Sequence, residues 1–181
     1  MIKIIRVILF IIRSILIKNF YFTNVKSQNQ NKESLFINYL SNFLRHKNGI
    51  ELGFHYNQFN LVGIYKKNYN IVLIDGGPIL NVLLMRFINL FLRKKLRVVH
   101  KFIDKGNISE ILLFEKIGIF SIDIDGNDYW ILKKLELTSD IVVLEYNPIF
   151  GDIYKLSIIY ESDFDRNKKH FSNTYFGCSI Q

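Results

Sequence analysis

The chain has 181 residues, a formal net charge of +8 at pH 7 and one cysteine, Cys178. Apolar residues make up 49% of it and aromatic residues 15%, which excludes a largely disordered chain and allows one domain with a substantial core. A single cysteine excludes a disulfide framework and a thiolate zinc site, and it favours a reducing, cytoplasmic location. The positive charge indicates an anionic partner, such as an acidic glycan or a lipid headgroup. Nucleic acid is not expected, because the basic residues form no long tract or nucleic-acid motif.

Residues 1–34 are predicted to form a basic amphipathic helix followed by a polar linker. The apolar run Met1–Phe22 is interrupted too often by basic side chains to span a bilayer, and no signal-peptide cleavage site follows it. The interrupting residues are Lys3, Arg6, Arg13 and Lys18. Two interpretations stay open: residues 1–22 make peripheral contact with the inner face of a membrane, or the helix packs its apolar face on the domain.

Residues 35–181 are predicted to form a single α/β domain. Strands are predicted at Ile50–Phe54, Ile71–Ile74, Arg97–Phe102, Ile117–Ile124 and Ile141–Tyr146. Helices are predicted at Leu35–His46, in a segment ending at Tyr65, and at Pro78–Phe91, Asn107–Leu113 and Tyr129–Leu137. This alternation predicts a doubly wound, mostly parallel Rossmann-like sheet. The last two strands are continuous apolar runs, which is typical of strands buried on both faces.

Acidic and amide side chains gather where the strand Ile117–Ile124 gives way to a helix. They are Asp123, Asp125, Asn127 and Asp128. Ligands of open α/β sheets bind at the carboxyl ends of the strands, and crowded carboxylates there need a cation or hydrogen-bond donors. We therefore predict a ligand site at this turn.

Calcium loops and helix amino termini are also rich in acidic and amide residues. A calcium loop is excluded, because Gly126 stands at the fourth position instead of the sixth and Lys134 replaces the bidentate glutamate. Helix capping by Asn127 or Asp128 remains open, since acidic groups favour a helix amino terminus. Capping does not account for Asp123 and Asp125 as well.

A second group of residues suits a nucleoside cofactor. Glu51 and Gly53 close the first strand, and Asp75 closes the second. A glycine allows a tight turn beside the ligand, and an acidic residue one βα unit later can hold ribose hydroxyls. Asn57 and Gly76 belong to the same two loops and are included as cofactor-binding candidates. Ordinary turns remain the alternative, because the glycine pattern of the first loop is incomplete.

Five segments, in order, resemble bacterial S-adenosylmethionine-dependent methyltransferases of the FkbM-like group. They are ELGFHYNQFNL, IVLIDGG, SIDIDGNDYW, VVLEYNPIFG and SNTYFGCSI, and they span roughly residues 49–181. The resemblance implies S-adenosylmethionine as cofactor and methylation of a small-molecule or glycan acceptor, such as a hydroxyl of a surface-polysaccharide precursor. HYNQ stands where the family has a glycine-rich loop.

The resemblance also implies roles for individual residues. Glu51 and Gly53 would line the methionine and ribose region, Asp75 would hold the ribose hydroxyls, Asp104 would lie near the adenine, and Asp123 and Asp125 would face the methyl group and the acceptor.

Methyl transfer to a hydroxyl requires a proton acceptor, and we predict Asp123 or Asp125 in this role, with Asn127 positioning the hydroxyl. Glu145 follows the next strand, so Asp123, Asp125 and Glu145 together offer hard oxygen ligands of the kind that Mg²⁺ accepts. The segment Tyr160–Phe176 is predicted to cover the acceptor.

Within that segment, His170 or Asn173 is expected to reach the site, although a solvated loop position also explains His170. Trp130 is predicted to anchor its helix on the sheet.

The length after the fifth strand differs from that of a class I methyltransferase, whose sheet ends in an antiparallel hairpin of two further strands. Ile153–Tyr160 and Thr174–Ile180 are the segments that could be extended. Two alternatives to the methyltransferase therefore stay open. One is a truncated, non-catalytic remnant of the fold, and the other is a different glycan- or nucleotide-handling enzyme.

Overall fold

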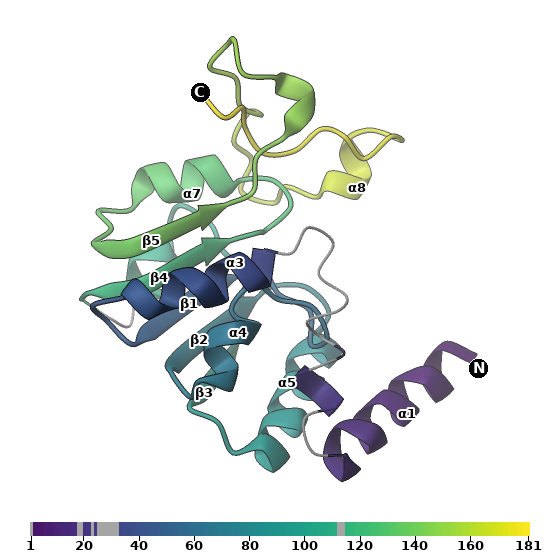
Figure 1. The fold of residues 1–181 in the computed structure, drawn as a ribbon. Coiled ribbons are helices and arrows are strands. Elements are labelled where there is room, and N and C mark those ends of the chain that lie inside the picture. The colour runs from purple at the N-terminus through teal and green to yellow at the C-terminus, as the bar shows by residue number, and fades with distance from the viewer. Residues whose placement is uncertain (1, 18–19, 23, 25–32, 112–114) are drawn as a thin grey trace.

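Five parallel strands form one sheet, in the order β3-β2-β1-β4-β5 (Figure 1). The computed structural model describes residues 2–17, 20–22, 24, 33–111 and 115–181. The strands are β1 (Asn48–Leu52), β2 (Asn70–Asp75), β3 (Leu96–His100), β4 (Ile117–Ile122) and β5 (Ser139–Leu144). The predicted Rossmann-like α/β fold is confirmed. Each end of every predicted strand lies within two residues of the corresponding end of an observed strand.

Helices connect the strands and flank the sheet. They are α1 (Ile2–Leu16), α3 (Glu33–Leu40), α4 (Val62–Lys66), α5 (Ile79–Leu92), α6 (Ile108–Ile111), α7 (Asp128–Lys134) and α8 (Arg166–Lys169), with 3-10 turns η1 (Ser41–Phe43) and η2 (Pro148–Phe150). Most of the predicted linker and the end of the predicted helix Asn107–Leu113 lie outside the described residues. Across the described ranges, no helix has both the length and the hydropathy needed to cross a bilayer.

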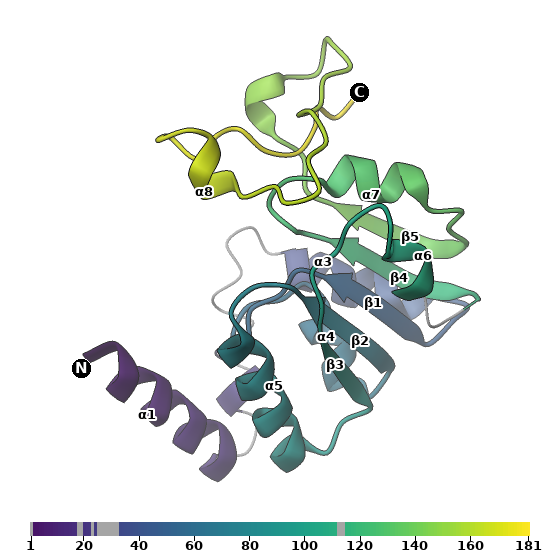
Figure 2. The ribbon, with the colours of Figure 1, turned by 180° about the vertical axis from the view of Figure 1, so that it is seen from behind.

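The two faces of the sheet pack into separate cores, as a doubly wound fold requires. Strand β2 shows the alternation: Ile71 and Leu73 join the core that includes α4 and α5, whereas Val72 and Ile74 join the core that includes α6 and α7. Figures 1 and 2 show the molecule from these opposite sides. Because both faces are covered, β4 is buried throughout and is mostly apolar, with Ser121 as its polar residue.

The position of β5 corrects one prediction. The sequence predicts a fully buried strand at Ile141–Tyr146, but β5 is an edge strand and is only partly buried. Val142 keeps 44% of its surface exposed. Strand β1, in contrast, is a central strand, because it pairs with β2 on one side and with β4 on the other. The strand order reverses at β1, and ligands of this fold class bind at such a switch point.

Residues 145–181 form an irregular segment beyond β5. Its two predicted extended segments, Ile153–Tyr160 and Thr174–Ile180, lie antiparallel to each other but make only the isolated bridge between Ser157 and Cys178. Two backbone hydrogen bonds flank this bridge, from Ile158 N–H to the Gly177 carbonyl at 3.1 Å and from Ser179 N–H to the Leu156 carbonyl at 2.8 Å.

Asn147 holds this segment together from its interior. The side chain is fully buried, and its Nδ2 donates to the carbonyls of Thr174 at 2.8 Å and Phe176 at 2.9 Å. The Asn147 backbone N–H donates to the Cys178 carbonyl at 2.7 Å. One residue therefore fixes the end of the chain to the end of β5.

Trp130 anchors the same segment, which corrects the prediction that it anchors its helix on the sheet. Its indole N–H donates to the Ile158 carbonyl at 2.8 Å. The Lys105 ammonium lies 4.2 Å from the Trp130 ring centroid and 4.0 Å from that of Tyr160. The neighbouring residue Ile131 is fully buried and packs α7 on the sheet instead.

Candidate functional site

The turns that follow β1 and β4 approach each other at Gly53. This residue has a φ of +76°, and a Cβ placed on it would lie 1.7 Å from the carbonyl oxygen of Asp123. Only glycine permits that conformation and that approach. The predicted strand Ile50–Phe54 therefore ends at Leu52, and the chain turns directly beside the acidic turn.

Glu51 fixes the loop that follows. Its side chain is 1% exposed, and its two carboxylate oxygens accept the backbone N–H groups of Asn60 at 2.8 Å and Leu61 at 2.9 Å. These groups lie at the amino-terminal end of α4, where helical N–H groups lack intrahelical partners. Glu51 thus organises the loop containing HYNQ while also contributing to the cavity wall.

The carboxyl ends of β1, β2, β4 and β5 surround a cavity of about 1070 Å³. Seven carboxyl side chains line it: Glu51, Asp75, Asp123, Asp125, Glu145, Asp163 and Asp165. Arg166 and Lys168 are the two Lys or Arg side chains among the lining residues. The cavity is therefore acidic although the whole chain is basic, and it favours a cationic ligand over a polyphosphate.

Asp128 shapes the acidic turn. It is fully buried, and its carboxylate accepts the N–H groups of Ile124 and Gly126, both at 2.9 Å. Burial raises the pKa of this carboxyl above its ordinary value, while the backbone hydrogen bonds oppose the shift. The N-cap residue Asn127 makes no side-chain capping bond to α7. Asp128 instead stabilises the turn before α7 by accepting the backbone N–H groups of that turn.

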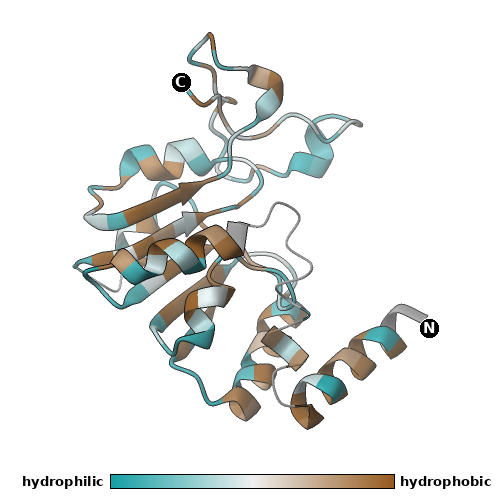
Figure 3. Cartoon of the chain, in the orientation of Figure 1, coloured by the Kyte–Doolittle hydropathy of each residue, from teal (hydrophilic) through white to brown (hydrophobic). Residues whose placement is uncertain are grey.

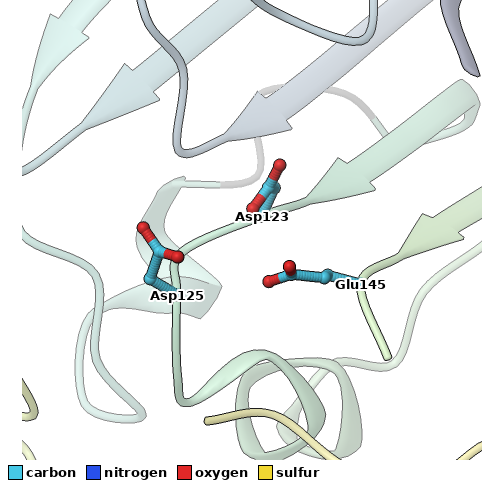
Figure 4. Close-up of side chains that lie close together, drawn as sticks. All are labelled: Asp123, Asp125 and Glu145. Atoms are coloured by element: carbon cyan, nitrogen blue, oxygen red, sulfur yellow. The ribbon is translucent and has the colours of Figure 1, made fainter. Parts of the chain in front are cut away.

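Asp123, Asp125 and Glu145 lie close together in this cavity. Figure 4 shows Glu145 reaching from the end of β5 toward the turn after β4. One carboxylate oxygen from each residue lies within 4.8 Å of the other two. Asp125, which has a φ of +58°, also forms an ion pair with Arg166 Nη1 at 2.6 Å. Three carboxylates in this arrangement suit a cation or a transferred proton.

The carboxyl group of Glu145 is strongly perturbed by its surroundings. Its Oε2 is buried without a hydrogen-bond partner among the described residues. Burial, followed by the charges of Asp123, Asp128 and Asp125, raises the pKa of Glu145 to about 8, although Arg166 acts in the opposite direction. A carboxyl group with such a pKa can exchange a proton near neutral pH.

Asn127 joins the acidic turn to the C-terminal segment. The residue is 3% exposed, and its Nδ2 donates to the Glu161 carbonyl at 2.7 Å. Its Oδ1 has no hydrogen-bond partner among the described residues, and Asn127 contributes to the cavity wall.

Asp75 and Gly76 form the wall at the end of β2. The Asp75 Oδ2 accepts a hydrogen bond from Asn81 Nδ2 at 3.1 Å. A Cβ on Gly76 would lie 2.5 Å from the Cα of Phe102, so this glycine is needed where β2 meets the segment after β3. Both predicted cofactor-binding residues thus belong to the same cavity as the acidic turn.

Three further candidates are not among the residues that line the cavity. Asn57 contacts the ring of His55 within its own turn. The Asp104 carboxylate accepts two backbone N–H groups of the turn that follows it, at 2.7 and 2.9 Å. His170 is exposed and bonds the Ser172 hydroxyl. Each of these side chains is engaged by residues two or three positions away.

The C-terminal segment covers one side of the cavity, as the sequence predicts for Tyr160–Phe176. Residues 162–168 and Asn173 line the cavity, whereas His170 does not. Sequence reasoning missed Arg166, whose guanidinium also stacks 3.7 Å from the Phe176 ring centroid. The charged and aromatic composition of the segment was the available signal, but it did not single out this arginine.

Fold and cavity together define a Rossmann-like α/β protein with an acidic site at the switch point of its sheet. Comparison of the chain with protein-family profiles, curated proteins and solved structures finds no match.

Proposed function

We propose that this protein is an S-adenosylmethionine-dependent methyltransferase that methylates a hydroxyl group of a sugar or surface-glycan precursor. The observation that carries the proposal is the acidic cavity at the switch point, lined by residues from the ends of four neighbouring strands. S-adenosylmethionine is a nucleoside with a cationic sulfonium, so it matches both the position and the charge of this cavity. The family resemblance of the sequence motifs points to the same chemistry.

The residues at the ends of β1 and β2 would hold the cofactor. Asp75 presents a carboxylate to the cavity beside the tight turn at Gly53, which is the arrangement that ribose hydroxyls require. Glu51 would act indirectly, because its carboxylate is occupied by the backbone of the following loop. When bound, the cofactor supplies an activated methyl group.

Glu145 is the best candidate for the proton acceptor. The cofactor would supply the methyl group to the acceptor hydroxyl and leave as S-adenosylhomocysteine, and the Glu145 carboxylate would take up the proton that the hydroxyl loses. A pKa of about 8 makes this carboxylate more basic than an ordinary one, and the deprotonated form that accepts the proton becomes more populated as the pH rises toward 8. Asp123 and Asp125, the acceptors favoured by the sequence, would then orient the hydroxyl together with Asn127.

The same three carboxylates fit a divalent cation such as Mg²⁺. One carboxylate oxygen from each residue lies within 4.8 Å of the other two, and carboxylate oxygens are hard ligands. The fit predicts that Mg²⁺ raises the melting temperature of the wild-type protein. An identical rise in Glu145→Gln would contradict binding at this cluster.

Calorimetric titration with S-adenosylhomocysteine tests the cofactor assignment. We expect binding by the wild-type chain and at least a tenfold weaker affinity for Asp75→Ala, roughly the 1.4 kcal/mol or more of a lost charge-assisted hydrogen bond. Asp152→Ala is the matched control, because Asp152 is exposed and does not line the cavity. Absence of binding by the folded wild-type chain would contradict the methyltransferase and favour the non-catalytic alternative. Equal affinity in wild type and Asp75→Ala would contradict the ribose contact.

A further inference from the structure

Helices α1 and α5 lie side by side and both expose apolar side chains (Figures 1 and 2). On α5, Val82, Met85 and Ile88 are buried against the sheet. The opposite face of α5 exposes Leu80, Leu83, Phe87, Leu90 and Phe91. Spacings of three and four residues place these side chains on one stripe of the helix. This stripe therefore faces away from the sheet.

Helix α1, which contacts α5, also exposes an apolar face. Phe10 packs against the core of the domain, and Ser14 beside it on the helix is buried. The outward face exposes Ile5, Ile8, Leu9, Ile12 and Leu16. Figure 3 shows the hydrophobic colouring of both helices. Exposed apolar side chains gathered on two adjacent helices mark a surface that contacts a partner or a membrane.

The charged side chains on α1 and α5, and on the segments next to them in the chain, have one sign. Arg6 and Arg13 are exposed on α1, and Arg86, Arg93 and Lys95 are exposed on or just after α5. Residues 2–17 and 76–103 contain neither Asp nor Glu. A second copy of the chain docked on this face would bring like charges together, whereas an anionic surface would be attracted. An apolar stripe flanked by basic side chains is the pattern of helices that lie in a membrane interface.

We propose that the exposed faces of α1 and α5 together form a docking surface for a bilayer containing anionic phospholipid. The apolar side chains enter the boundary between headgroups and acyl chains, and the arginine and lysine side chains contact the phosphate groups. This inference extends the membrane contact predicted for residues 1–22 to α5, and it does not depend on the proposed methyl transfer.

Co-sedimentation of the full chain with lipid vesicles tests this surface. We expect binding to phosphatidylcholine vesicles that contain phosphatidylglycerol, little binding to pure phosphatidylcholine, and weaker binding as salt is raised. The double variant Leu83→Gln/Leu90→Gln should bind at least about tenfold more weakly, because two exposed leucines no longer enter the bilayer. The variant Arg6→Gln/Arg13→Gln should bind anionic vesicles about fivefold more weakly for each charge removed.

Ile153→Gln/Ile159→Gln is the matched control, since both isoleucines are exposed in the C-terminal segment, away from the two helices. It should bind like wild type. No binding of wild type to anionic vesicles, or equal losses in the control and the α5 variant, would overturn the proposal. A dimer in sedimentation velocity that the α5 variant dissociates would assign the surface to a second copy of the chain instead.

Discussion

Glu145 combines a buried oxygen without a partner among the described residues and a carboxyl group that keeps its proton near neutral pH. The folded chain holds this proton up to about pH 8, whereas in the unfolded chain an ordinary glutamate releases it near pH 4.5. Between these values the unfolded state binds fewer protons than the folded state, so this group makes the protein less stable as the pH rises. Glu145 therefore costs stability at the pH where it is useful as a proton acceptor.

The variant Glu145→Gln removes this cost. Its free energy of unfolding should exceed that of wild type by about 2 kcal/mol at pH 8 and by little at pH 5. The full pKa shift would correspond to more, but the side chain is partly exposed. Denaturant unfolding at both pH values measures the difference, with the exposed substitution Glu136→Gln as control. A stability gain of equal size at both pH values would contradict the raised pKa.

Among the elements, the irregular segment after β5 is held by a few buried or partly buried side chains instead of a continuous ladder of backbone hydrogen bonds. Asn147 and Trp130 supply hydrogen bonds to its backbone, and Asn127 ties it to the acidic turn. Since residues of this segment line the cavity, its attachment determines the shape of the site.

Replacing Asn147 by Ala should detach this segment while the sheet remains folded. The carbonyls of Thr174 and Phe176 would lose their donor, which costs on the order of 2–4 kcal/mol. Amide hydrogen exchange should then accelerate at Ile158, Gly177 and Ser179 and remain slow in β1 and β4. Asp152→Ala, an exposed change in the same segment, should leave these rates as they are. Uniform acceleration across the sheet would show that Asn147 supports the whole domain instead.

The strands and the site show which features could be predicted from the sequence and which could not. Short apolar runs that alternate with helical patterns are typical of a parallel sheet, so all five strands were recognisable, as was the acidic turn after β4. The end of β1 was missed by two residues, because its turn at Gly53 depends on the backbone of Asp123. The ion pair between Asp125 and Arg166 joins positions 41 residues apart, and no local pattern encodes that distance.

At the scale of the whole molecule, Gly53 joins the two halves of the sheet. Gly53→Ala should lower the free energy of unfolding by about 3 kcal/mol or more, because its Cβ would overlap the Asp123 carbonyl. Gly177→Ala is the matched control: its φ of +64° is also positive, but the atoms nearest to its Cβ position lie 3.9 Å away, at ordinary van der Waals distance. It should cost about 1 kcal/mol from backbone strain alone. Equal losses of unfolding free energy in the two variants would show that the close approach to Asp123 adds nothing to the cost of Gly53→Ala.

The central position of β1 determines the order in which the sheet can assemble. Its pairing with β2 is comparatively local, whereas the Asn48 side chain meets the Gly118 N–H 70 positions later. During synthesis, β1, β2 and β3 can associate while the edge of β1 that receives β4 is still open. Long-range parallel pairing of this kind is slow, and an open strand edge invites pairing with another chain. The acidic cavity is therefore among the last features to form, since its walls come from both halves of the sheet.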